Sequence, residues 1–175
     1  MRQFALGVVT AIAVLGLGAW SYLKLGLAGV QADESAPLWE NRLMSSAVRA
    51  SVHRSAAKIQ SKVPTGDENL VAGGKHYVNG CAGCHGDLGK SPRPPVILYT
   101  PIPQLPEVGT QYSSAEVFWV VKHGIRRTGM SAYGPFYTEE QIWDIAAFLE
   151  HIKNLPPGVL ERIQSKAPKD AGDRQ

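Results

Sequence analysis

The sequence predicts a chain whose regular elements are all helices, and three observations carry this prediction. The run from Phe4 to Leu23 contains no charged residue. Apolar residues recur at intervals of three or four in several later segments, which is the spacing of one face of a helix. Six of the twelve prolines lie between Pro92 and Pro106, and this density is incompatible with a regular helix or a central strand.

The amino-terminal uncharged run has the length of a membrane-spanning helix, which needs about 20 residues. A cleaved signal peptide is the alternative, because Arg2 gives a positive start and Val30-Gln31-Ala32 resembles a cleavage site before Asp33. The run is longer than a signal-peptide core of about 7 to 15 residues. We therefore expect residues 1–32 to form an uncleaved single-pass transmembrane anchor, with everything after it exported.

Residues 33–66 are predicted to form a linker unit dominated by one basic amphipathic helix. Its apolar stripe consists of Trp39, Leu43, Ala47, Val48, Val52, Ala56, Ile59 and Val63. Within residues 36–63, five Lys and Arg residues against Glu40 alone make the other positions basic. Two interpretations stay open, a solvated spacer that packs loosely on the next domain and a docking helix beside the membrane. Pro64 and Gly66 mark the domain boundary.

The charge distribution does not indicate a nucleic-acid partner. From Asp67 to the end the chain has 11 Lys and Arg against 12 Asp and Glu, so the formal net charge of +3 comes from the first third. The later region is near neutral, and we expect no nucleic acid to bind it.

The motif Cys81-Ala82-Gly83-Cys84-His85 has the spacing used to attach a c-type haem. Both thiols can add to vinyl groups of one porphyrin, while the adjacent imidazole presents a nitrogen to iron. A zinc site would need two more soft ligands, and the chain has only two cysteines. A redox dithiol would need a preceding strand, whereas residues 67–80 are typical of a helix. We therefore expect one covalently attached haem c and no disulfide.

Residues 67–155 are predicted to form the haem domain, beginning with a helix that runs into the motif. Thr65 and Glu68 have the spacing of a capping box. Gly73 and Gly74 lie inside the helix, where glycine costs about 1 kcal/mol relative to alanine, so we expect the last helix to approach them closely. For the proline-rich segment two interpretations stay open. One is a stiff loop around the haem, in which one proline carbonyl accepts a hydrogen bond from His85, and the other is an ordinary irregular connection.

Two more helices are predicted in this domain. Ser113 with Glu116 forms a capping box for a helix that stops at Gly124, and residues 138–141 open a final helix ending at Asn154. Residues 156–175 are expected to form a polar tail, frayed from Gly158 on.

Met130 is the only methionine of the haem domain. Methionines are usually core filler, but Gly129, Ser131 and Ala132 flank this one, so we expect its thioether on a flexible, unobstructed turn. Three cations, Lys122, Arg126 and Arg127, precede that turn and are candidates for partner docking or for pairing with haem propionates. The alternative is an ordinary solvated loop, because clustered surface charge is common.

A family resemblance rests on three segments, which are Gly73-Gly74-Lys75-His76-Tyr77 with the haem motif and Gly86, residues 122–132, and residues 138–143. Over residues 67–155 the chain resembles a membrane-anchored class I cytochrome c, and it is similar to monohaem domains of bacterial respiratory complexes. The resemblance implies an all-helical class I cytochrome c fold, His85 as proximal ligand and Met130 as distal ligand. Ser131 departs from it, since many relatives have proline there.

A histidine and a methionine together fill both axial positions of the iron, so we expect an electron-transfer protein and no enzyme. The resemblance implies a quinol-linked donor and an oxidase or other acceptor, in the periplasm, with the chain acting alone or as a subunit of a membrane complex. One alternative is a haem sensor or peroxidase-like enzyme in which Met130 only packs. Another is a bis-histidine haem that uses His123 or His76.

Overall fold

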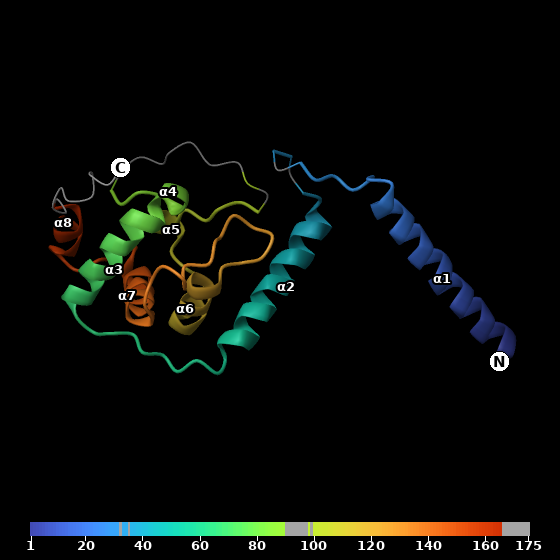
Figure 1. Ribbon diagram of the computed structural model, residues 1–175, viewed down its shortest axis with the longest axis horizontal. Helices are drawn as coiled ribbons and strands as arrows, with labels where there is room; N and C mark the ends of the chain where they lie inside the picture. Colours follow the sequence, from blue (N-terminus) through green and yellow to red (C-terminus); the bar gives the residue numbers. More distant parts are fainter. Residues whose placement is uncertain (32, 35, 90–97, 99, 166–175) are drawn as a thin grey trace. The chain divides into compact units, whose positions relative to one another are not determined.

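The computed structural model describes residues 1–31, 33, 34, 36–89, 98 and 100–165 (Figure 1). Within these residues every regular element is a helix, which confirms the predicted fold class. The chain divides into two compact units, Met1–Glu34 and Ser35–Gln175. Ala32 of the candidate cleavage site, most of the first half of the proline-rich segment and the last ten residues of the predicted tail lie outside the described residues.

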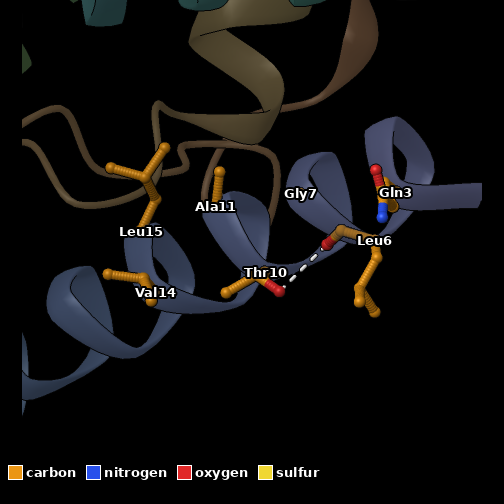
Figure 2. Close-up of a pocket in the computed structure, with 7 residues that line it drawn as sticks. All are labelled: Gln3, Leu6, Gly7, Thr10, Ala11, Val14 and Leu15. Atoms are coloured by element: carbon orange, nitrogen blue, oxygen red, sulfur yellow. Dashed lines mark hydrogen bonds between the residues drawn. The ribbon is translucent and has the colours of Figure 1, made fainter.

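The first unit contains α1 (Arg2–Lys24), which is long and apolar enough to cross a membrane by length and composition. None of its side chains is buried. Figure 2 shows the face on which Gly7 and Ala11 leave a shallow hollow, beside Thr10 Oγ1, which donates a hydrogen bond to the Leu6 carbonyl at 2.9 Å. A single helix cannot enclose a ligand, so this hollow is no candidate functional site.

In the second unit, α3 (Asp67–Gly80) and α7 (Glu139–His151) cross at very short range. A Cβ added to Gly73 would overlap the Asp144 carbonyl and lie 2.9 Å from Phe148 Cβ. Near the crossing, Asn69 Nδ2 donates to Asp144 Oδ1 at 2.9 Å. Only glycine allows this approach, which confirms the predicted contact with the helix that was expected to be last.

The core forms where α6 (Ser114–His123) and α3 both pack on α7 (Figure 1). Phe118 and Trp143 stack with ring centroids 4.4 Å apart, and Tyr77 meets Phe148 at 5.4 Å. The predicted capping box that opens α6 is present, and α6 ends before Gly124 as expected. Thr138 and Gln141 form another capping box at the start of α7. These helix boundaries are local features, which explains why the sequence predicts them.

Two predictions at the edges of this domain are wrong. Gly66, at φ 154°, caps α3 in place of Thr65, and Glu68 forms an ion pair with Arg162 at 2.6 Å instead of closing a capping box. Residues 159–164 are not a frayed tail but helix α8 (Val159–Gln164), with Val159 and Ile163 buried. Ile163 covers Gly74, where an added Cβ would overlap its side chain.

The linker helix α2 (Leu38–Ala56) is shorter than the predicted stripe, and its carboxyl-terminal half packs on α6 (Figure 1). Val52 and Ala56 are buried, at 1% and 3% exposure. Arg49 Nη2 donates to Gln111 Oε1 at 3.1 Å. Residues 57–66, which connect α2 to α3, are not helical, but the side chains of Ile59 and Val63 still pack against the core. The apolar spacing therefore continues where the helix does not.

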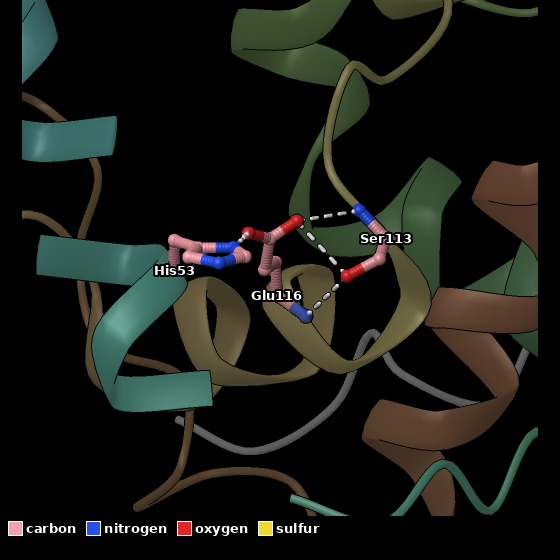
Figure 3. A network of polar contacts seen from close by, with 3 residues as sticks. All are labelled: His53, Ser113 and Glu116. Carbon is pink, nitrogen blue, oxygen red and sulfur yellow. Dashed lines mark hydrogen bonds and ion pairs between the residues drawn. The ribbon is translucent and has the colours of Figure 1, made fainter. Parts of the chain in front are cut away.

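Glu116 joins α2 to α6 (Figure 3). One carboxylate oxygen lies 3.0 Å from His53 Nδ1, and the other accepts from the Ser113 N–H at 2.8 Å and from its hydroxyl at 2.9 Å. These bonds, the Ser113 N–H above all, lower the pKa of Glu116. The same side chain thus caps α6 and holds the linker helix.

We expect Gly73→Ala to lower the free energy of unfolding by about 3 kcal/mol, because the new methyl group forces α3 and α7 apart. Gly83→Ala is the matched control, since a Cβ there has nothing within 4 Å, and its effect should stay within about 1 kcal/mol. Denaturant unfolding followed by circular dichroism measures both. Equal stabilities of the two variants would contradict the close packing.

Candidate haem site

One cavity in the second unit is lined by all four predicted site residues, Cys81, Cys84, His85 and Met130. Its walls come from α4 (Ala82–His85), the segment around α5 (Leu105–Val108), α6 and the loop after α6. The other lining side chains are largely aliphatic, including Ile102, Leu105, Val117, Val120, Val121 and Leu149. Two thiols, an imidazole and a thioether around an apolar cavity fit the requirements of a covalently held haem.

The haem motif forms a short helix that starts where α3 ends. Cys81 caps α3, and the His85 N–H donates to the Cys81 carbonyl at 2.9 Å. The fully buried Tyr77 hydroxyl lies 2.7 Å from the Gly86 carbonyl and 3.1 Å from that of His85. Burial raises the pKa of Tyr77, so the hydroxyl keeps its proton and remains a donor. Tyr77 therefore fixes the end of the motif.

His85 is oriented by the proline-rich segment, which supports the first of the two interpretations of that segment. Its Nδ1–H donates to the Pro103 carbonyl at 3.0 Å, so its Nε2 is the atom available to iron. Burial lowers the pKa of His85, although the bond to Pro103 opposes this effect. The imidazole is therefore neutral at neutral pH, which is the form that binds a metal.

The two cysteines differ in environment. Cys84 is exposed, whereas Cys81 is half-buried, and burial together with the neighbouring Cys84 raises the pKa of Cys81 to about 11. Before either sulfur bonds to a porphyrin, the raised pKa keeps the Cys81 thiol protonated at neutral pH.

Two side chains remote in sequence hold the backbone around the cysteines. Tyr133 donates its hydroxyl proton to the Gly80 carbonyl at 2.7 Å, and Gln104 Nε2 donates to the Cys84 carbonyl at 3.2 Å. Sequence reasoning missed both, because nothing local marks them. Tyr77 carried a usable signal, since it lies four residues before Cys81 and so one helical turn away.

The Met130 loop is tied down and is not the flexible turn that the sequence suggests. The Ile125 N–H donates to the Met130 carbonyl at 3.0 Å. The Thr128 hydroxyl donates to the Ile125 carbonyl at 2.8 Å and accepts from the Met130 N–H at 3.1 Å. Gly124, at φ 67°, allows the loop to fold back, because a Cβ there would lie 2.6 Å from the Met130 carbonyl oxygen.

His76 and His123, the alternative iron ligands, are not among the described residues that line the cavity. His76 meets the Tyr137 ring edge-on at 5.0 Å, and burial lowers its pKa. His123 is exposed, with its ring 5.1 Å from that of Trp119. Met130 lines the cavity and these two histidines do not.

Residues 68–149, somewhat less than half of the chain, match the protein family described as "Cytochrome C oxidase, cbb3-type, subunit III". The matched segment runs from the second residue of α3 to the last turn of α7 and contains the whole candidate site. Comparison with curated proteins and with solved structures gave no match.

We expect Cys81→Ser and Cys84→Ser each to lose much of the covalently held haem, because each removes one thiol that bonds to the porphyrin. His85→Ala should leave no stable low-spin haem, since the imidazole is lost. Haem staining after denaturing electrophoresis, with protein made in cells that export and mature c-type cytochromes, measures attachment. Wild-type protein without covalent haem in that assay would contradict the assignment.

Proposed function

Because residues 68–149 form a monohaem c-type cytochrome domain that binds haem c covalently, we propose that the protein transfers single electrons through a haem ligated by His85 and Met130. The observation that carries this proposal is the meeting of both thiols, the imidazole and the thioether in one apolar cavity. When bound, the haem supplies an iron that alternates between two oxidation states one electron apart.

The residues of the chain support this role in three ways. Cys81 and Cys84 hold the haem, and Pro103 keeps His85 in the tautomer that exposes Nε2. The tied loop presents Met130 from another part of the cavity lining. If His85 and Met130 both bind the iron, no coordination position would remain for a substrate or for oxygen. The thioether and the aliphatic walls favour the reduced state and a high reduction potential.

The proposed location is the periplasmic side of a membrane, with α1 retained as a single-pass anchor. The uncharged length of α1 supports retention. A quinol-linked donor and an oxidase or similar acceptor are the proposed partners. The matching family is described as an oxidase subunit, which favours a subunit of a membrane complex over a free carrier.

Met130→Ala tests the proposed ligand set. Oxidised wild-type protein should show the weak far-red band of sulfur bound to ferric haem, and Met130→Ala should lose it, bind added small ligands and have a lower reduction potential. Spectra and redox titration measure these effects. Met44→Ala is a matched control, since Met44 lies in α2 and should leave the band unchanged.

Two results would contradict His85–Met130 ligation. A high-spin wild-type haem that binds carbon monoxide quickly would support a sensor or peroxidase-like enzyme. A low-spin haem without the far-red band would make His123 and His76 the next residues to replace.

We expect the mature chain to keep its amino-terminal residues and to resist extraction from membranes by carbonate or high salt, because α1 offers an uncharged span of sufficient length. The mass of the mature protein and its partition after carbonate washing measure this. A mature chain starting at Asp33 would show that the segment is a cleaved signal peptide.

Arg126 and Arg127 are the cations best suited to docking a redox partner. Lys122 pairs with Glu139 at 2.6 Å, whereas Arg126 and Arg127 are exposed, and no side chain in the described residues pairs with them. Both lie between Ile125 and Thr128, which line the haem cavity. They are therefore close to the site along the chain and free to meet an acidic surface.

We expect Arg126→Glu to slow electron transfer to the physiological acceptor at low ionic strength and much less at high ionic strength, because salt screens the lost attraction. Lys75→Glu is the control, since Lys75 is an exposed residue of α3 that does not line the cavity. Stopped-flow rates over a series of salt concentrations measure both variants. Rates equal to wild type at every concentration would exclude this docking role.

A further inference from the structure

Helix α2 has apolar stripes on two opposite sides, and the described residues cover only one of them. The inner stripe is Val48, Val52 and Ala56, of which Val52 and Ala56 are buried. The outer stripe is Trp39, Leu43 and Ala47, at the same spacing of four. The two stripes are offset by nine residues, which at about 100° per residue is half a turn. Trp39 and Leu43 remain 67% and 58% exposed.

The length of the connection limits how far the outer stripe can lie from the proposed anchor. Thirteen residues connect the end of α1 at Lys24 to the start of α2 at Leu38. Fully extended, such a segment reaches about 45 Å at most. The outer stripe lies in the half of α2 nearest to this connection. Its tryptophan is a residue type enriched where proteins meet the membrane–water interface.

The charge of α2 favours an anionic surface. Helix α2 carries three arginines against Glu40. Arg49 is held by Gln111, but Arg42 and Arg54 are exposed without a partner in the described residues. Arg54 lies eleven residues beyond Leu43, about three turns, and so on the same side as the outer stripe. Positive charge beside the stripe disfavours pairing of two α2 helices and favours anionic lipid headgroups.

We infer that the outer stripe of α2 lies in the headgroup region of an anionic bilayer and that α2 thereby holds the haem domain against the membrane. Helix α2 packs on α6, His53 in its carboxyl-terminal half contacts Glu116, and Val52 and Ala56 are buried, so the domain turns with the helix. This inference depends on retention of α1 in the membrane but not on the ligands of the haem.

The four tryptophans of the chain provide the test, because each reports a different environment. Trp20 lies on α1, Trp39 on the outer stripe, Trp119 half-buried on α6, and Trp143 in the core. The full haem-loaded chain, labelled with 5-fluorotryptophan, is placed in nanodiscs of phosphatidylcholine and phosphatidylglycerol that hold one copy each. Trp39→Phe assigns the fluorine resonance of Trp39. Spectra are recorded with a spin-labelled lipid and, separately, with a water-soluble gadolinium chelate.

The lipid label should reduce the Trp39 signal about as strongly as that of Trp20 and leave Trp119 and Trp143 nearly unchanged, while the chelate should spare Trp39. Replacing phosphatidylglycerol by phosphatidylcholine should weaken the lipid effect on Trp39 but not on Trp20. Leu43→Asn should expose Trp39 to the chelate. Val108→Asn is the matched control, because Val108 is also 58% exposed, and it should change nothing.

Three outcomes would overturn the inference. If the chelate reduces the Trp39 signal and the lipid label does not, the stripe is in water. If both agents spare Trp39, protein covers the stripe. If the lipid label reduces the Trp39 signal equally with and without phosphatidylglycerol, the stripe does not depend on an anionic surface. If the lipid label does not reduce the Trp20 signal, α1 does not lie in the membrane, and the proposed anchor is wrong.

Discussion

The contact between α3 and α7 at Gly73 determines where the haem motif lies. Because α3 runs directly into Cys81, holding α3 against Asp144 and Phe148 positions the first cysteine and the turn that carries His85. Helix α6, which leads to the Met130 loop, packs on the same α7. The packing of α3 and α6 on α7 thus positions two parts of the cavity wall, one at Cys81 and one at Met130. These two residues are far apart in the sequence.

The sequence predicts what depends on neighbouring residues. The capping box predicted at Ser113 needs only a side chain and a partner three residues later, and it is present. The helix predicted to open at residues 138–141 is also present, as α7. Gly73 was informative because glycine within a helix is unfavourable unless another element needs the space. The haem motif was informative because its chemistry requires that spacing.

What the sequence does not predict depends on contacts between distant segments. Residues 159–164 are half apolar, with Val159, Leu160 and Ile163, and only the packing of α8 on α3 makes Val159 and Ile163 part of the core. Thr128 is an ordinary loop residue until its hydroxyl joins Ile125 to Met130. Similarly, Tyr133 reaches Gly80 across 53 positions of the chain. No periodicity reports such pairs.

Glu116 takes part in more contacts than His53, so the chain should tolerate a substitution at position 53 better than one at position 116. Its carboxylate closes the amino terminus of α6 and also receives His53 of α2 (Figure 3). Replacing His53 removes one of these roles, whereas replacing Glu116 removes both. We therefore expect residue 53 to vary among homologues and residue 116 to stay acidic. The change in the free energy of unfolding on replacing both residues should differ from the sum of the two single changes. The contact between α2 and α6 can thus change only in ways that keep Glu116, because the haem domain needs this residue to cap α6.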